Sequence, residues 1–100
     1  MSRPRRSPLR KALFTEACEI LLEIHEAGGT KAPLKELIEQ SKIGKHSWYK
    51  YYRLLAEHGF IEVVQETFPG RIFLNLTEKG KKIAELLKQI ESEVEEKEGN

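Results

Sequence analysis

Residues 54–87, LLAEHGFIEVVQETFPGRIFLNLTEKGKKIAELL, contain a helix end, two strand-like runs and a helix start in succession. Gly59 stands directly after a helical pattern, where glycine commonly ends a helix. The runs at 60–66 and 71–76 are rich in β-branched and aromatic residues, and the letters TFPG between them supply turn chemistry. This stretch therefore predicts a β-hairpin between two helices, the second of them capped by Thr77.

Three helices are predicted ahead of this stretch. The first rests on apolar residues at helical spacing that stop before two glycines: Leu13, Ala17, Ile20 and Ile24, then Gly28 and Gly29. A shorter helix over 33–41 and a third over about 45–58 are joined by a glycine-containing connector at 42–44. Because a hairpin follows directly, this order is that of a helix-turn-helix with a wing. The sequence predicts one α+β domain, mainly helical, with a small β-hairpin.

Two phrases in the chain resemble the winged helix-turn-helix transcription regulators of the MarR and PadR kind. They are Leu55, Glu57, Gly59, Phe60 and Ile61, and then Leu76, Thr77, Glu78, Lys79 and Gly80. The similarity covers roughly residues 12–90, with Phe60 where leucine is commoner. It implies a DNA-binding domain and a long C-terminal helix that forms a dimer. The expected organisation is a basic flexible arm at 1–8, the winged domain at 9–76 with its recognition helix at about 45–58 and its wing at about 60–76, a dimerisation helix at 77–97 and a tail at 98–100.

The third helix has two distinct faces when its residues are placed about 100° apart. The inward face is predicted to hold Trp48, Tyr51, Tyr52 and Leu55. The opposite side carries basic and polar side chains, as a helix in the DNA major groove requires. The predicted DNA contacts on this helix are Lys45, His46, Ser47, Tyr49, Lys50 and Arg53. An ordinary solvated helix face is the alternative interpretation.

Basic residues outside this helix extend the predicted DNA surface. Arg71 follows the hairpin turn, where a guanidinium would reach the minor groove; a strand-edge arginine that covers the sheet is the alternative. Arg5 and Arg6 belong to an arm with two prolines, which we expect to follow the minor groove or the phosphates without forming a helix. A disordered tail that only aids solubility is the competing interpretation of this arm.

The last helix, about 30 Å long at 1.5 Å per residue, is longer than a cover for this small domain needs to be. Its apolar stripe predicts a two-fold dimer, which would place two recognition helices about one DNA turn apart. The residues predicted for this interface are Ile83, Leu86, Leu87, Ile90 and Val94. Phe14 and Leu22, off the main core stripe of the first helix, are further candidates for it. The alternative is a helix that frays beyond Ile90.

Several classes of function are disfavoured by the composition. Of 100 residues 33% are charged, no apolar run approaches the roughly 18 residues of a membrane span, and Cys18 is the single cysteine. No phosphate-binding glycine loop, catalytic constellation or histidine pair suggests an enzyme, a cofactor or a metal site. We therefore expect a cytoplasmic, nucleoid-associated homodimer that binds double-stranded DNA as a sequence-specific transcription regulator. A DNA-architectural or plasmid-partition protein is the alternative, and a protein-interaction module is a weaker one.

Overall fold

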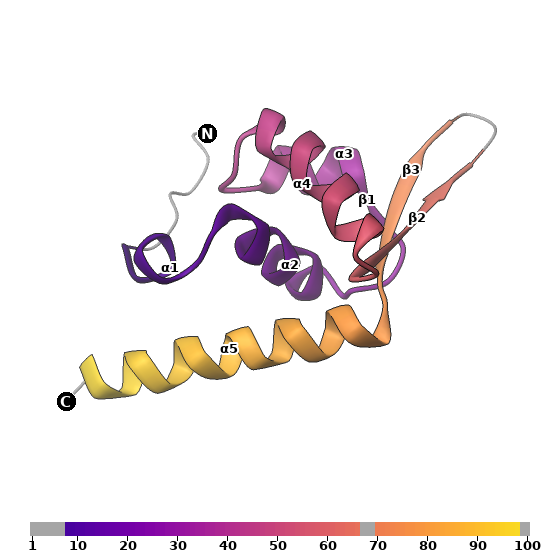
Figure 1. Cartoon of the computed structure of the whole chain (residues 1–100). Coiled ribbons are helices and arrows are strands. Elements are labelled where there is room, and N and C mark those ends of the chain that lie inside the picture. Colours follow the sequence, from indigo (N-terminus) through magenta and orange to yellow (C-terminus); the bar gives the residue numbers. More distant parts are fainter. Residues whose placement is uncertain (1–7, 67–69, 99–100) are drawn as a thin grey trace.

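The computed structural model describes residues 8–66 and 70–98 (Figure 1). The elements along the chain are α1 (Pro8–Leu13), α2 (Glu16–Glu26), β1 (Ala32–Pro33), α3 (Leu34–Gln40), α4 (Lys45–Glu57), β2 (Ile61–Gln65), β3 (Ile72–Leu76) and α5 (Glu78–Glu98). The α+β winged helix-turn-helix predicted from the sequence is confirmed, with α3 and α4 as the helix pair and β2 and β3 as the wing. Strand β1 and helix α1 were not predicted.

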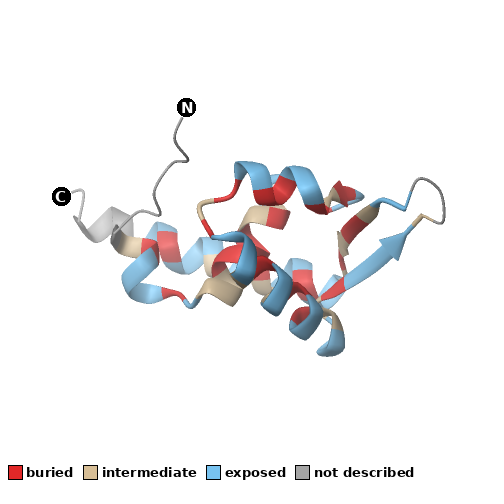
Figure 2. Ribbon diagram, turned by 90° about the horizontal axis from the view of Figure 1, so that it is seen from above, coloured by how far each residue is buried: buried red, intermediate tan, exposed pale blue. Residues whose placement is uncertain are grey.

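The sheet has the order β1-β3-β2, and all of its pairings are antiparallel. In the hairpin, Ile61 lies opposite Leu76 and Gln65 opposite Ile72. The short β1 adds to the other edge of β3, where Ala32 pairs with Leu74. Beyond Ile61 the side chains of β2 are exposed, so the hairpin projects from the body (Figure 2).

The core lies where α2, α3 and α4 meet the root of the sheet. Ile20 and Ile24 of α2, Trp48 of α4 and Leu74 of β3 are all fully buried. Helix α5 packs along the opposite side of α2 from α4 (Figure 1). Helix α2 is therefore the central element, covered by the helix-turn-helix on one side and by α5 on the other.

The LTEKG phrase has a structural explanation at the junction of α4, β3 and α5. The Thr77 hydroxyl donates to the carbonyl oxygen of Gly59 at 2.6 Å and accepts the N–H of Gly80 at 3.0 Å, so it caps α5 as predicted. A Cβ atom on Gly80 would lie 1.9 Å from the carbonyl oxygen of Phe60. Only a residue without a side chain lets the first turn of α5 approach the end of α4 this closely.

The N-terminal part of the described chain differs from the prediction. Residues 8–13 form α1 instead of a continuous start of the next helix, and α2 begins after Thr15, whose hydroxyl accepts the N–H of Cys18 at 3.3 Å. Leu13 was predicted to lie on the core face but is 45% exposed, because the chain turns between the two helices. Phe14 and Leu22 are buried within the chain, so their proposed availability for a dimer interface was wrong.

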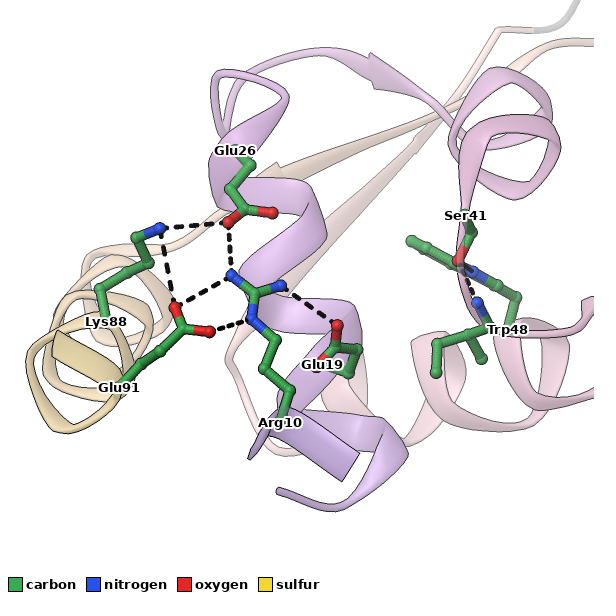
Figure 3. Close-up of polar contacts among 8 residues, drawn as sticks. Arg10, Glu19, Glu26, Ser41, Trp48, Lys88 and Glu91 are labelled. Carbon is green, nitrogen blue, oxygen red and sulfur yellow. Dashed lines mark hydrogen bonds and ion pairs between the residues drawn. The ribbon is translucent and has the colours of Figure 1, made fainter. Parts of the chain in front are cut away.

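Arg10 explains why α1 is held against the body. Its guanidinium is buried and donates to Glu19 at 3.1 Å and to Glu26 at 2.6 Å, both on α2, and to Glu91 on α5 (Figure 3). The hydrogen bond to Glu91 contributes most to a raised pKa of Arg10, against the opposing effect of burial. Burial alone would raise the pKa of Glu26, but Arg10 and Lys88 hold it below its usual value. Arg10, which the sequence reasoning did not single out, thus joins three helices in one ion cluster.

Candidate nucleic-acid interface

The inward face of α4 fixes the orientation of the whole helix. Trp48 is fully buried, Tyr52 and Leu55 are each 5% exposed, and Tyr51 is half-buried, as the helical wheel predicted. Three large side chains locked in the core leave α4 little freedom to rotate about its axis. The opposite face is therefore presented to solvent in one fixed orientation.

A buried hydroxyl connects α4 to the turn before it. Ser41 Oγ accepts the indole N–H of Trp48 at 2.6 Å and the backbone N–H of Ile43 at 2.8 Å (Figure 3). With both acceptor positions occupied, the Ser41 proton is free to be donated to Glu23 on α2. Burial raises the pKa of the Glu23 carboxyl, and the hydrogen bond from Ser41 opposes that shift. This network joins α2, the turn and α4.

The outward face of α4 carries several cationic and polar side chains, with Leu54 exposed at their edge. Lys45, His46, Lys50 and Arg53 are exposed, and Tyr49 among them is 42% exposed. From residue 45 to residue 56 the sequence contains no acidic residue. Tyrosine rings lie beneath the cations: Lys45 over Tyr49 at 5.9 Å, Lys50 over Tyr51 at 5.2 Å and Arg53 over Tyr52 at 5.9 Å, each measured to the ring centroid. The aromatic residues thus support basic groups that point outward.

Ser47 occupies a different position from its neighbours. It is half-buried, and its hydroxyl donates to Glu16 Oε1 on α2 at 2.8 Å. Its hydroxyl proton is therefore already used within the chain, and Ser47 ties the first turn of α4 to the first turn of α2. Its predicted contact with DNA remains a prediction.

Of the basic residues predicted outside α4, the structure describes Arg71 but not Arg5 and Arg6. Arg71 is exposed at the turn end of the wing, directly before β3, where its carbonyl oxygen accepts the N–H of Glu66 at 2.9 Å. It lies at the wing side of α4, next to the same groove as Lys45 and Tyr49. Arg5 and Arg6 lie outside the described residues.

The predicted dimerisation stripe of α5 is divided between two environments. Leu86 and Ile90 are 45% and 47% exposed, whereas Ile83, Leu87 and Val94 are half-buried. The side of α5 that is buried carries Gly80, Ala84 and Glu91. Ile83 packs against the core from this side, whereas Leu86 and Ile90 lie on the outward flank of the helix.

A groove of about 590 Å³ lies between α3, the start of α4 and the turn end of β3 in the wing. Its lining includes Lys35 of α3, which the sequence reasoning did not single out. The sequence could have pointed to Lys35 only through its position on the exposed side of α3, opposite the buried residues Leu34, Leu37 and Ile38. Local pattern could not show that this side faces the wing.

Other kinds of site find no support in the part of the chain that the structure describes. Residues 8–66 and 70–98 contain no group of three or more histidine, cysteine or acidic side chains placed to hold a metal ion. Within the same residues, no helix is long and apolar enough to cross a membrane.

The fold matches several solved structures. AF1382 from Archaeoglobus fulgidus is 27% identical, the match covers 87% of this chain and 97% of that one, and the TM-score is 0.73. The F-93 protein of SSV1 is 23% identical over 92% of this chain and 98% of its own, with a TM-score of 0.62. A MarR protein from Peptoclostridium difficile is 24% identical over 88% of this chain, with a TM-score of 0.71, and the match spans 57% of that protein.

Comparison of the sequence alone finds no matching family model and no matching curated protein. The resemblance to MarR-like winged-helix proteins is nevertheless confirmed at the level of the fold by the solved structures.

Proposed function

We propose that this protein binds double-stranded DNA sequence-specifically as a homodimeric transcription regulator. The observation that carries the proposal is the outward face of α4, where Lys45, Tyr49, Lys50 and Arg53 stand exposed on a helix whose other face is locked in the core. Thirteen residues give a helix of about 20 Å, and the major groove, about 12 Å wide, admits such a helix. The solved structures with the same fold include a protein named MarR, which agrees with this assignment.

Each side chain on this face has a chemically defined role in the proposal. Arg53 can read guanine through two parallel hydrogen bonds, and Lys45 and Lys50 are suited to phosphates as point charges. Tyr49 can pack on a thymine methyl group or donate its hydroxyl to a phosphate. Arg71 at the turn end of the wing would reach the minor groove or the backbone.

Selection of bound sites from random duplex DNA tests the proposal. We expect an enriched motif with two inverted half-sites about one helical turn apart, because a two-fold dimer presents two copies of α4. A pool without an enriched motif would contradict sequence-specific regulation. If footprints on random DNA spread into long continuous protection, the protein is instead an architectural or partition protein that coats DNA.

The dimer is proposed to form through the outward flank of α5. Leu86 and Ile90 are exposed apolar side chains one helical turn apart, and burying them against a second copy would remove both from water. Sedimentation of Ile90→Glu is expected to show a monomer, whereas Gln89→Glu, with the same new charge at the adjacent position, should remain a dimer. A dimer that persists in Ile90→Glu would place the interface elsewhere.

A further inference from the structure

The groove beside the recognition helix combines an apolar floor with a charged rim. Its floor is formed by Pro33, Leu34, Ile38 and Ile72. Its charged and aromatic members come from three elements that are far apart in the sequence: Lys35, Glu36 and Glu39 of α3, Lys45 and Tyr49 of α4, and Arg71 at the start of β3. The fold therefore brings together three cations that no sequence pattern connects.

These cations outnumber the two acidic residues that share the groove. Lys35, Lys45 and Arg71 are exposed, and among the described residues none of them forms an ion pair with Glu36 or Glu39. Lysine is depleted in protein–protein interfaces, so a rim of this kind fits a polyanion better than it fits a protein partner. Lys45, Tyr49 and Arg71 also belong to the surface proposed above for DNA, and the groove continues that surface towards α3.

We infer that this groove seats the sugar–phosphate backbone of one DNA strand and that Lys35 is a phosphate contact. The inference rests on the proposed DNA-binding function and adds to it a residue and a second helix. Phosphate is the expected target because lysine acts as a flexible point charge, whereas base reading needs a side chain from the helix inside the groove. Seated in this way, the backbone passes between α4 and the wing and fixes the depth of α4 in the major groove.

The same geometry gives Glu39 the opposite role. A carboxylate that lines a groove filled by phosphate repels the DNA, since like charges at short range disfavour association. Removal of a positive and of a negative charge from α3 should therefore change DNA affinity in opposite directions. A general loss of helix stability could not produce this pair of effects.

Titration of a fluorescent duplex with the full chain between 50 and 200 mM salt tests the inference. Each phosphate contact contributes about 0.9 to the slope of log affinity against log salt, and the proposed dimer presents Lys35 twice, so the slope should fall by about 1.8. Over this fourfold range of salt, the affinity of Lys35→Gln should therefore drop by a factor about 12-fold smaller than that of the wild type. Lys35→Gln should also bind more weakly at 50 mM salt on every DNA sequence, and Glu39→Gln should bind more tightly. Lys82→Gln is the matched control, because Lys82 is an exposed lysine on α5, on the far side of α2 from the groove (Figure 1).

A salt slope of Lys35→Gln equal to that of the wild type would overturn the inference. So would a slope for Lys82→Gln reduced by the same amount, since net charge alone would then explain the effect, and so would weaker binding by Glu39→Gln. If the wild type shows no salt-dependent binding to any duplex, the proposed function fails and the inference with it. If the wild type binds and Arg53→Ala weakens it while Lys35→Gln does not, the inference alone is wrong.

Discussion

Replacement of Gly80 by alanine separates the effect of local helix propensity from that of tertiary packing. Gly80 lies in the first turn of α5, where alanine is expected to stabilise a helix by about 0.8–1.0 kcal/mol relative to glycine. The structure predicts instead that Gly80→Ala lowers the free energy of unfolding. The added methyl group would lie 1.9 Å from the carbonyl oxygen of Phe60, which is backbone and part of the junction between α4 and the wing.

The size of the effect follows from what has to move. Ordinary contact begins at 3.4 Å, so α5 and the Phe60 carbonyl must separate by about 1.5 Å, the difference between 3.4 and 1.9 Å. That carbonyl accepts the backbone N–H of Thr77 at 3.1 Å, a hydrogen bond worth about 1 kcal/mol that the shift would weaken. With about 1–3 kcal/mol for overpacking and the propensity gain subtracted, we expect a net loss of about 1–3 kcal/mol.

Urea denaturation at a single protein concentration, followed by circular dichroism, measures this change; the concentration is fixed because dimerisation would shift the apparent stability. Lys81→Ala is the matched control, since Lys81 is the exposed neighbour on the same helix and its replacement should alter stability by less than about 0.5 kcal/mol. A Gly80→Ala protein as stable as the wild type, or more stable, would refute the packing argument.

Four further predictions test the Ser41 network, the Arg10 ion cluster and the role proposed for α4. Ser41→Ala leaves the indole N–H of Trp48 and a backbone N–H without their acceptor, so the free energy of unfolding should fall by about 2–3 kcal/mol, whereas Ser92→Ala on the exposed side of α5 should have little effect. Arg10→Met removes the buried cation that Glu19, Glu26 and Glu91 share and should cost about 3–5 kcal/mol in urea denaturation; a loss below 1 kcal/mol would mean that the cluster contributes little. In the wild type, Glu26 should stabilise the fold above its unfolded pKa of about 4.5, and this stabilisation should disappear as pH falls through the lower folded pKa. Thermal melts over this pH range should show a weaker pH dependence for Arg10→Met. Arg53→Ala should cost about 1–3 kcal/mol in DNA affinity and relax preference at one base position, and an unchanged preference in the selected sites would exclude base reading by Arg53.

The division of α4 into two faces was predictable because it is a local property. The 3.6-residue period alone places Trp48, Tyr52 and Leu55 on one side and Tyr49, Lys50 and Arg53 on the other. The structure agrees in the burial of the first group and the exposure of the second. The hairpin was predictable for the same reason, since its register follows from two short runs joined by one turn.

The errors arose where a residue's environment depends on distant parts of the chain. Arg10 lies in a run of basic residues and was given no structural role, but its partner Glu91 is 81 positions away on α5. Leu13 fits the helical period of the next helix, yet the chain turns before that helix begins and leaves it exposed. Neither the run of basic residues around Arg10 nor the helical period at Leu13 contains information about which distant element packs against the residue.

By itself, the sequence determined the order of the main helices and the hairpin, the residues that end or cap them, and the inward and outward faces of α4. These properties depend on residues within one or two turns of each other, where backbone geometry fixes the spacing. Only the tertiary structure decided that Gly80 must lack a side chain, that Arg10 joins α1, α2 and α5, and that Lys35 shares a groove with Lys45 and Arg71. Each of those facts is a distance between elements far apart in the chain, and such distances are set by how the whole core packs.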